Sequence, residues 1–184
     1  SSEPEVKRQK HAEEPVNIQE RTENVRKFLE KLNKDDKATV INAIKDRRSL
    51  IQKALLTKNM DLVGLLIEHG ANVFLIPPGG NSSFHLAMYD INILKGLIQT
   101  LKDKGLDKQI PAECGKVVYY AIFEKKLECL KFLLEEGNLF HQFINIDIMN
   151  VTPLHVGFGE GQAEAVKTLL ERGADWKKPV QKDG

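Results

Sequence analysis

The chain has 184 residues, of which 41% are hydrophobic and 29% charged, and its formal net charge at pH 7 is +1. This charge balance gives no support to binding of nucleic acid or of an acidic membrane surface by the chain as a whole. No apolar run reaches the roughly 20 residues that a membrane-spanning helix needs, so we expect no membrane insertion.

The first segment, residues 1–19, carries mixed charge and two prolines but few apolar side chains. Such a segment cannot bury enough apolar surface to offset the entropy of ordering, about 1–2 kcal/mol per residue. We therefore expect a flexible lead-in to the folded part of the chain.

Two helices are predicted in residues 20–48. The apolar side chains of the first have the i, i+3, i+4, i+7 spacing of one helix face: Val25, Phe28, Leu29 and Leu32. The second is expected to begin after Asp35 or Asp36. The apolar side chains that it should bury are Val40, Ile41 and Ile44. No obvious hairpin follows, so we interpret this pair of helices as an N-terminal cap.

Beyond residue 48 the sequence repeats itself with a period near 33. Four segments end in a glycine that follows an apolar helical pattern, and those glycines are Gly70, Gly105, Gly137 and Gly173. Their separations are 35, 32 and 36 residues. Glycine adopts the left-handed conformation that commonly ends a helix, so each of these positions predicts the end of a repeat.

The start of a repeat is clearest in Thr152-Pro153-Leu154-His155, which begins 21 residues before Gly173. Thr152 is suited to cap a helix, and Pro153 fits the first turn. The segment from Ser82 to Ala87 fills the same slots earlier in the chain. Each repeat is thus predicted to hold two helices joined by a turn.

These repeats resemble the ankyrin repeat family, whose signature is present in residues 152–155 and in Gly173-Ala174-Asp175. The resemblance covers residues 49–176 and implies an all-α fold, an ankyrin-repeat solenoid of stacked helix–turn–helix units with hairpin loops and an N-terminal helical cap. The expected repeats are residues 49–81, 82–115, 116–151 and 152–176. The first and third depart from the signature in their turn residues but keep its apolar spacing.

Two adjacent slots support this alignment independently. Five residues after each helix start the side chain is small, as in Ala54, Ala87, Ala121 and Gly157. The next slot is large and apolar, as in Leu55, Met88, Ile122 and Phe158. Residues 177–184 look like the hairpin that opens a further repeat, and the alternative is a polar terminal tail.

We expect no enzymatic activity and no cofactor. His85 and His155 occupy the histidine slot of the repeat, where the resemblance implies hydrogen bonds between neighbouring turns rather than catalysis. Cys114 and Cys129 make neither a disulfide framework nor a metal site, which favours a reducing, cytoplasmic compartment. The glycines between Gly157 and Gly161 follow a helix-opening turn, so a phosphate-binding loop is not predicted.

The predicted binding surface lies on the concave face of the array, where the fourth and seventh residues after each helix start should point. The apolar side chains at these slots are Leu56, Leu86, Tyr89, Tyr120 and Phe123. Exposed aromatic groups on such a face are typical binding anchors. The hairpin tips supply a second set, in which we expect Phe74, Ile76 and Phe143 to be exposed. The alternative is that the hairpins fold over the concave face and cover it.

We therefore predict a module that binds another protein, with no nucleic-acid partner and a monomeric state by itself. Such a module could belong to a scaffold, an adaptor or a bacterial effector that acts in the host cytosol. The alternative is the targeting or regulatory region of a larger enzyme whose catalytic domain lies outside this chain. A nucleotide-binding groove is disfavoured, since Lys53 is the lone basic residue at the mapped slots.

Overall fold

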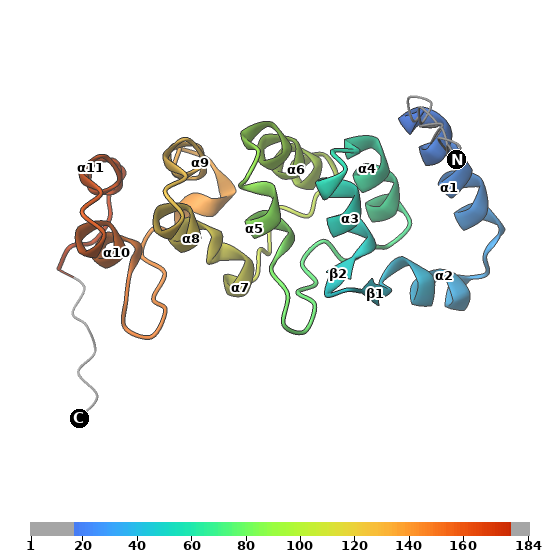
Figure 1. Cartoon of the computed structure of the whole chain (residues 1–184), viewed down its shortest axis with the longest axis horizontal. Coiled ribbons are helices and arrows are strands. Elements are labelled where there is room, and N and C mark those ends of the chain that lie inside the picture. The colour runs from blue at the N-terminus through green and yellow to red at the C-terminus, as the bar shows by residue number, and fades with distance from the viewer. Residues whose placement is uncertain (1–16, 178–184) are drawn as a thin grey trace, which may run out of the picture.

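The chain forms a row of stacked helix pairs, and the structure, a computed structural model, describes residues 17–177 (Figure 1). The elements in chain order are α1 (Ile18–Lys31), α2 (Lys34–Ile41), β1 (Ile44–Lys45), β2 (Arg48–Ser49), α3 (Leu50–Leu56), α4 (Met60–Glu68), α5 (Ser83–Ala87), α6 (Ile91–Asp103), α7 (Ala112–Gly115), α8 (Val117–Phe123), α9 (Leu127–Leu133), the 3₁₀ helix η1 (Leu139–Phe143), α10 (Pro153–Gly159) and α11 (Ala163–Glu171). Residues 178–184, where a further repeat was predicted, lie outside the described part.

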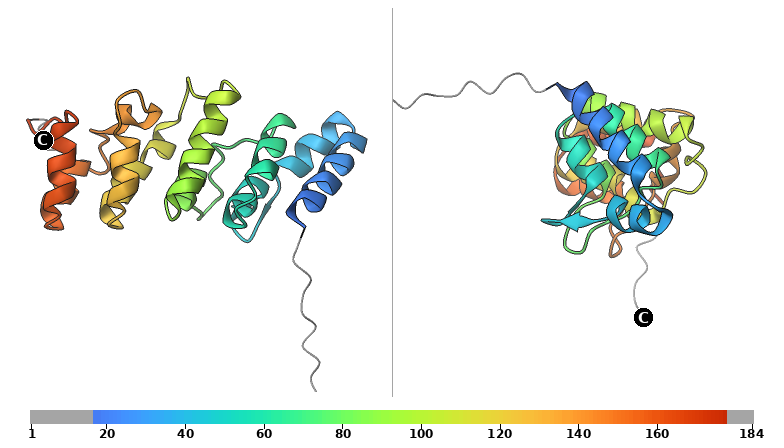
Figure 2. Two further views of the ribbon diagram at one scale, coloured as in Figure 1. Left: turned by 90° about the horizontal axis from the view of Figure 1, so that it is seen from above. Right: turned by 90° about the vertical axis from the view of Figure 1, so that its right-hand side faces the viewer.

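The helices make two layers. An inner row is formed by α3, α5, α8 and α10, each in contact with the next, and an outer row is formed by α4, α6, α9 and α11. Figure 2 shows the same succession from above, with the cap helices at one end and α10 and α11 at the other. Because the main contacts between helices run from each repeat to the next, this is a solenoid, and the all-α prediction is confirmed.

The residues predicted to begin and end helices do so in the structure. Thr152 caps α10 in a capping box, with Pro153 in the first turn, and Ser82 caps α5. The four repeat-ending glycines all have positive φ, between 67° and 94°. The fifth residue after each helix start must be small because the inner and outer helices approach closely there. A Cβ at Gly157 would lie 2.9 Å from Val166.

The N-terminal cap differs in detail from its prediction. The first helix begins at Ile18, capped by Asn17, which is two residues before the expected boundary. The second begins at Lys34, before the predicted start, because the side chain of Asn33 caps it. Leu29 and Ile41 are buried as expected. The expectation that Ile44 is buried is wrong, because Ile44 is 43% exposed in β1.

The first repeat does open with a hairpin, which the sequence interpretation missed. Strands β1 and β2 pair antiparallel, with Ile44 opposite Ser49 and Lys45 opposite Arg48. The two loop residues, Asp46 and Arg47, have φ of 56° and 58°, the left-handed conformation of a tight two-residue hairpin. Asn-Gly or Asp-Gly would have signalled this turn, whereas Asp-Arg does not.

The segment that leads into the third repeat forms no β-hairpin of the kind that β1 and β2 make. The helical turn α7 takes its place and runs directly into α8. Gly115, at the end of α7, lies under the ring of Phe143, and a Cβ at this glycine would come within 2.4 Å of that ring. The close approach explains why a glycine stands at this position.

Candidate functional site

The inner helices expose a row of large apolar side chains. Leu56 is 43% exposed, Tyr89 56% and Phe123 54%, although each lies next to buried core residues. They share one slot, at or just past the end of α3, α5 and α8, so the stacking of the repeats sets them on neighbouring helices. Leu86 and Tyr120 lie on the same helices and are half-buried. We name these five predicted residues, Leu56, Leu86, Tyr89, Tyr120 and Phe123, the inner-helix patch.

Aromatic contacts link the patch across two repeats. The ring of His85 lies 4.5 Å from that of Tyr120, measured between centroids, and 6.1 Å from that of Tyr89. Tyr119, which the sequence interpretation missed, packs edge-on against Tyr120 at 5.5 Å and stacks on Phe123 at 6.4 Å. Tyr119 fills the histidine slot of the third repeat, and the Tyr-Tyr pair was the signal that could have identified it.

Glu124 holds this cluster in place. Its carboxylate accepts a hydrogen bond from the hydroxyl of Tyr89, and its other oxygen lies 2.8 Å from Nε2 of His85. The ammonium of Lys126 lies over the Tyr89 ring, 5.0 Å from its centroid. The hydrogen bond to Glu124 raises the pKa of Tyr89 to about 12, since it favours the protonated phenol. Tyr89 is thereby tied to the next repeat while its ring stays exposed.

The two histidines differ in what they bind. His85 links two repeats through Glu124, so it connects side chains of neighbouring helices rather than neighbouring turns. His155 accepts hydrogen bonds within its own turn, from the backbone N–H and the hydroxyl of Thr152. The turn-to-turn link predicted for this slot is made by Gln52 in the first repeat, whose amide donates to the carbonyl of Asn81 at 2.8 Å.

The cysteines are core residues. Cys114 and Cys129 are free and buried. The thiol of Cys129 lies 3.0 Å from the carbonyl oxygen of Met88 and so joins repeats two and three. Burial raises the pKa of Cys114 to about 11 and also raises that of Cys129, which disfavours the reactive thiolate. Within residues 17–177, no group of three or more His, Cys, Asp and Glu side chains could hold a metal ion.

The predicted hairpin tips are not exposed. Phe74, Ile76 and Phe143 are half-buried and pack against the core. Phe74 stacks on the buried Phe84 with 6.2 Å between ring centroids, because these loops fold back against the helices. The apolar tip that does reach solvent is Met149, at 91% exposure in the left-handed turn before α10.

The patch ends at the fourth repeat. At the positions that correspond to Tyr120 and Phe123 of repeat three, repeat four has Val156, which is buried, and Gly159, which has no side chain. Lys53 fills the corresponding slot at the other end of the row and is partly exposed. The patch therefore belongs to repeats one to three.

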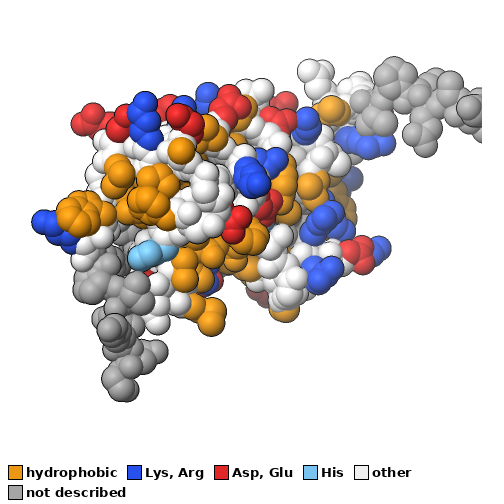
Figure 3. Space-filling model, turned by 60° about the vertical axis from the view of Figure 1, so that its left-hand side comes forward, with side chains coloured by type: hydrophobic (Ala, Val, Ile, Leu, Met, Phe, Trp, Pro, Cys, Tyr) orange, Lys and Arg blue, Asp and Glu red, His pale blue; other side chains and the backbone are white. Residues whose placement is uncertain are grey.

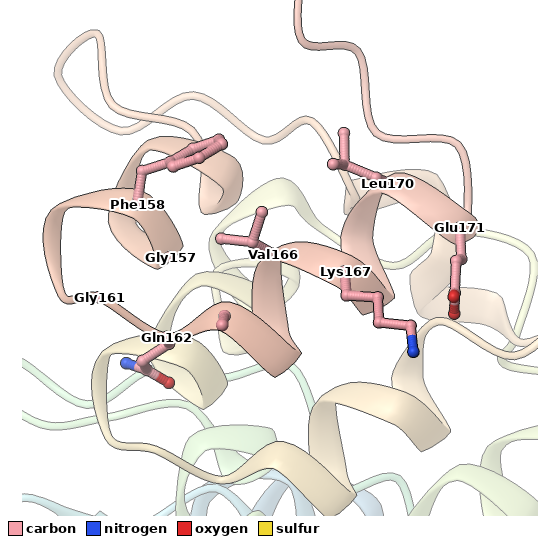
Figure 4. Close-up of a pocket in the computed structure, with 9 residues that line it drawn as sticks. Gly157, Phe158, Gly161, Gln162, Val166, Lys167, Leu170 and Glu171 are labelled. Carbon is pink, nitrogen blue, oxygen red and sulfur yellow. The ribbon is translucent and has the colours of Figure 1, made fainter.

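A second apolar surface covers the C-terminal face of α10 and α11. Hydrophobic side chains gather at this end of the molecule (Figure 3). Phe158, Val166 and Leu170 line a hollow of 520 Å³ and point to the same side of the helix pair (Figure 4). Phe158 is 65% exposed, although Ile122, in the same slot of the preceding repeat, is buried.

Stacked helix pairs with an exposed row of aromatic side chains are typical of repeat proteins that bind a partner on an extended surface. Residues 90–179 match the family model of ankyrin repeats. An ankyrin repeat protein of Acanthamoeba polyphaga mimivirus is 29% identical over 126 residues, which make up 68% of this chain and 36% of the relative. With the fold, these matches show that residues 90–179 contain ankyrin repeats, and ankyrin repeats are protein-interaction modules.

Among the helices of residues 17–177, none is long and apolar enough to cross a membrane.

Proposed function

We propose that this chain binds a segment of another protein on the inner-helix patch. The observation that carries the proposal is the row of Leu56, Tyr89 and Phe123, which are about half exposed in one slot of three successive repeats. Burying large apolar and aromatic side chains in a protein interface gives much of its binding energy, and such residues dominate measured hot spots.

The fixed geometry of the aromatic cluster supports the same proposal. Glu124 fixes the position of Tyr89, and ring packing between Tyr119 and Phe123 restricts both side chains before any partner arrives. Immobilising a flexible side chain costs about 0.5–1.5 kcal/mol on binding, and side chains that are already restricted avoid much of that loss.

The wider role depends on what flanks the array. A partner-binding array of this kind serves equally in a scaffold, in an adaptor, in an effector that acts in a host cytosol, or as the targeting region of an attached enzyme. The sequence of the full reading frame separates these settings, because a catalytic domain would identify the last of them.

Affinity capture with matched variants tests the proposal. The chain is immobilised, and the proteins it retains from a cell lysate are compared with those retained by Leu56→Ser/Phe123→Ser. The control is Phe158→Ser/Leu170→Ser, which removes one aromatic and one aliphatic side chain from the C-terminal face, 65% and 44% exposed. Circular dichroism first establishes that all three chains are folded.

We expect the wild type and the control to retain the same proteins and the patch variant to lose them. Substitutions at exposed positions change stability by about 0.5 kcal/mol or less, so unfolding would not explain the loss. Equal retention by the wild type and the patch variant would rule out the inner-helix patch as the binding surface. Loss from the control alone would assign the interaction to the C-terminal face.

A further inference from the structure

Charge is unevenly distributed along the inner face of the array. Helices α5, α8 and α10 contain no Lys, Arg, Asp or Glu. By contrast, residues 44–58, which form the β1–β2 hairpin and α3, contain five basic side chains and one acidic. The outer helices α4, α6, α9 and α11 together carry six acidic and four basic side chains. The inner face therefore has one basic end, and the other inner helices carry no charged side chain of their own.

The basic side chains at this end are available to a partner. Lys45, Arg47 and Arg48 are exposed, and Lys53 is partly exposed. None of these four takes part in an ion pair within the described residues, and their neighbour Lys58 pairs with Asp90. We name Lys45, Arg47, Arg48 and Lys53 the basic end of the inner face.

The basic end adjoins the inner-helix patch. A hollow of 170 Å³ is lined by Asp46, Arg47 and Arg48 from the first hairpin, by Gly79, Gly80 and Asn81 from the second loop, and by Leu86 of the patch. A guanidinium nitrogen of Arg47 lies 3.4 Å from the carbonyl oxygen of Gly79 and bridges the two loops. An extended chain can thus contact the arginines and the apolar side chains in one run.

We infer that the partner segment carries acidic side chains next to aliphatic or aromatic ones. This inference rests on the proposed function. Its carboxylates lie against Arg47 and Arg48, since guanidinium groups pair with carboxylates through two parallel hydrogen bonds. Its apolar side chains lie on Leu86, Tyr89 and Phe123. The charges fix the direction of the bound segment, and the apolar contacts supply most of the affinity.

The same face disfavours a single-stranded nucleic acid, which would also use basic and aromatic side chains. The carboxylate of Glu124 stands beside the rings of Tyr89 and His85, at the centre of the cluster. A phosphate backbone that passed over these rings would meet this negative charge, and α5 and α8 add no basic side chain to the ammonium of Lys126 over the Tyr89 ring.

Selection of peptides tests the inference without knowledge of the natural partner. A phage library of random linear peptides is selected on the whole chain, and the affinities of the selected peptides are measured by fluorescence anisotropy at low and high salt. Three variants are compared with the wild type: Arg47→Glu/Arg48→Glu, the patch variant Leu56→Ser/Phe123→Ser, and the control Lys102→Glu/Lys131→Glu. The control makes the same charge change on exposed positions of the outer helices.

We expect the selected peptides to be enriched in Asp and Glu beside aliphatic or aromatic residues. Their affinity should fall at least about tenfold in the arginine variant and less than about twofold in the control. High salt should weaken binding to the wild type more than to the arginine variant.

The other outcomes separate the two proposals. Peptides without acidic enrichment, or peptides that need the patch but not the arginines, would overturn the inference and leave the proposed function standing. Peptides that need the arginines but bind the patch variant normally would overturn the proposed function. Failure to select any peptide would overturn both proposals. If a fluorescent oligothymidylate competes with the selected peptides and binds more tightly than they do, nucleic-acid binding would replace the inference.

Discussion

Equivalent positions of the repeat are buried at the junction between repeats two and three but exposed on the open face of repeat four. Met88 and Ile122 are each 1% exposed, because the inner helix of the following repeat covers them. Phe158 fills the same slot in repeat four and is 65% exposed. The difference shows that burial in a solenoid is a property of two adjacent repeats and not of one repeat sequence.

The polar contacts follow the same division. At the junction, His85 and Tyr89 of repeat two bind Glu124 of repeat three. In repeat four, His155 binds Thr152 of its own turn. The junction therefore combines apolar packing with side-chain links.

The largest effect is expected for Ala121→Glu. Ala121 is fully buried where α8 meets its neighbours, so a carboxylate there would be an unpaired charge in the core. We expect the free energy of unfolding to fall by about 4 kcal/mol or more. Urea denaturation followed by circular dichroism measures this change. A cooperative transition with an unchanged midpoint would show that the junction does not enclose this position.

The register of the repeats could be predicted from the sequence, because it depends on local chemistry. Thr152 and Pro153 begin a helix, and Gly173 ends one, for reasons that act within a few residues. The small slot at Ala121 and the large one at Ile122 follow from the same period. Four of the five predicted patch residues lie at or next to the junction for this reason.

The parts that could not be predicted depend on contacts between segments that are distant in the sequence. Phe143 was expected at an exposed tip, but its ring covers Gly115 of the preceding repeat. Tyr89 was expected on the face, but its link to Glu124 requires the three-dimensional stacking. The hairpin of repeat one was missed for a different reason, since Asp46 and Arg47 adopt a conformation that their residue types seldom signal.

A matched pair of alanine substitutions isolates the effect of the neighbouring repeat. Ile122→Ala, in repeat three where the inner helix of repeat four covers this position, should lower the free energy of unfolding by about 2–4 kcal/mol, because it removes buried contacts and leaves a cavity. Phe158→Ala, in the same slot of repeat four, should change it by about 0.5 kcal/mol or less. Urea midpoints of both variants provide the test. A loss from Phe158→Ala as large as that from Ile122→Ala would show that the C-terminal face is covered in solution.

The smallest effect is expected for the link between Tyr89 and Glu124, and it is best observed as a titration. The folded pKa of Tyr89 is raised from 10.0 to about 12, so its phenol keeps its proton when the unfolded chain would lose it. The stabilisation is therefore present in full below pH 10 and is lost between pH 10 and 12. Because Tyr89 is more than half exposed, solvent screens the link and the stability effect is small.

Ultraviolet absorbance of tyrosinate, recorded against pH, follows this titration. Tyr89→Phe assigns the step, because the difference between it and the wild type is the absorbance of Tyr89 alone. In Glu124→Gln we expect the pKa of Tyr89 to fall towards 10, since the carboxylate that accepts the phenolic hydrogen bond is gone. A step near 10 in the wild type would mean that the hydrogen bond is not formed in solution. The junction would then be held by its apolar packing and by the remaining contact of Glu124 with His85, and the ring of Tyr89 would be free to move when a partner binds.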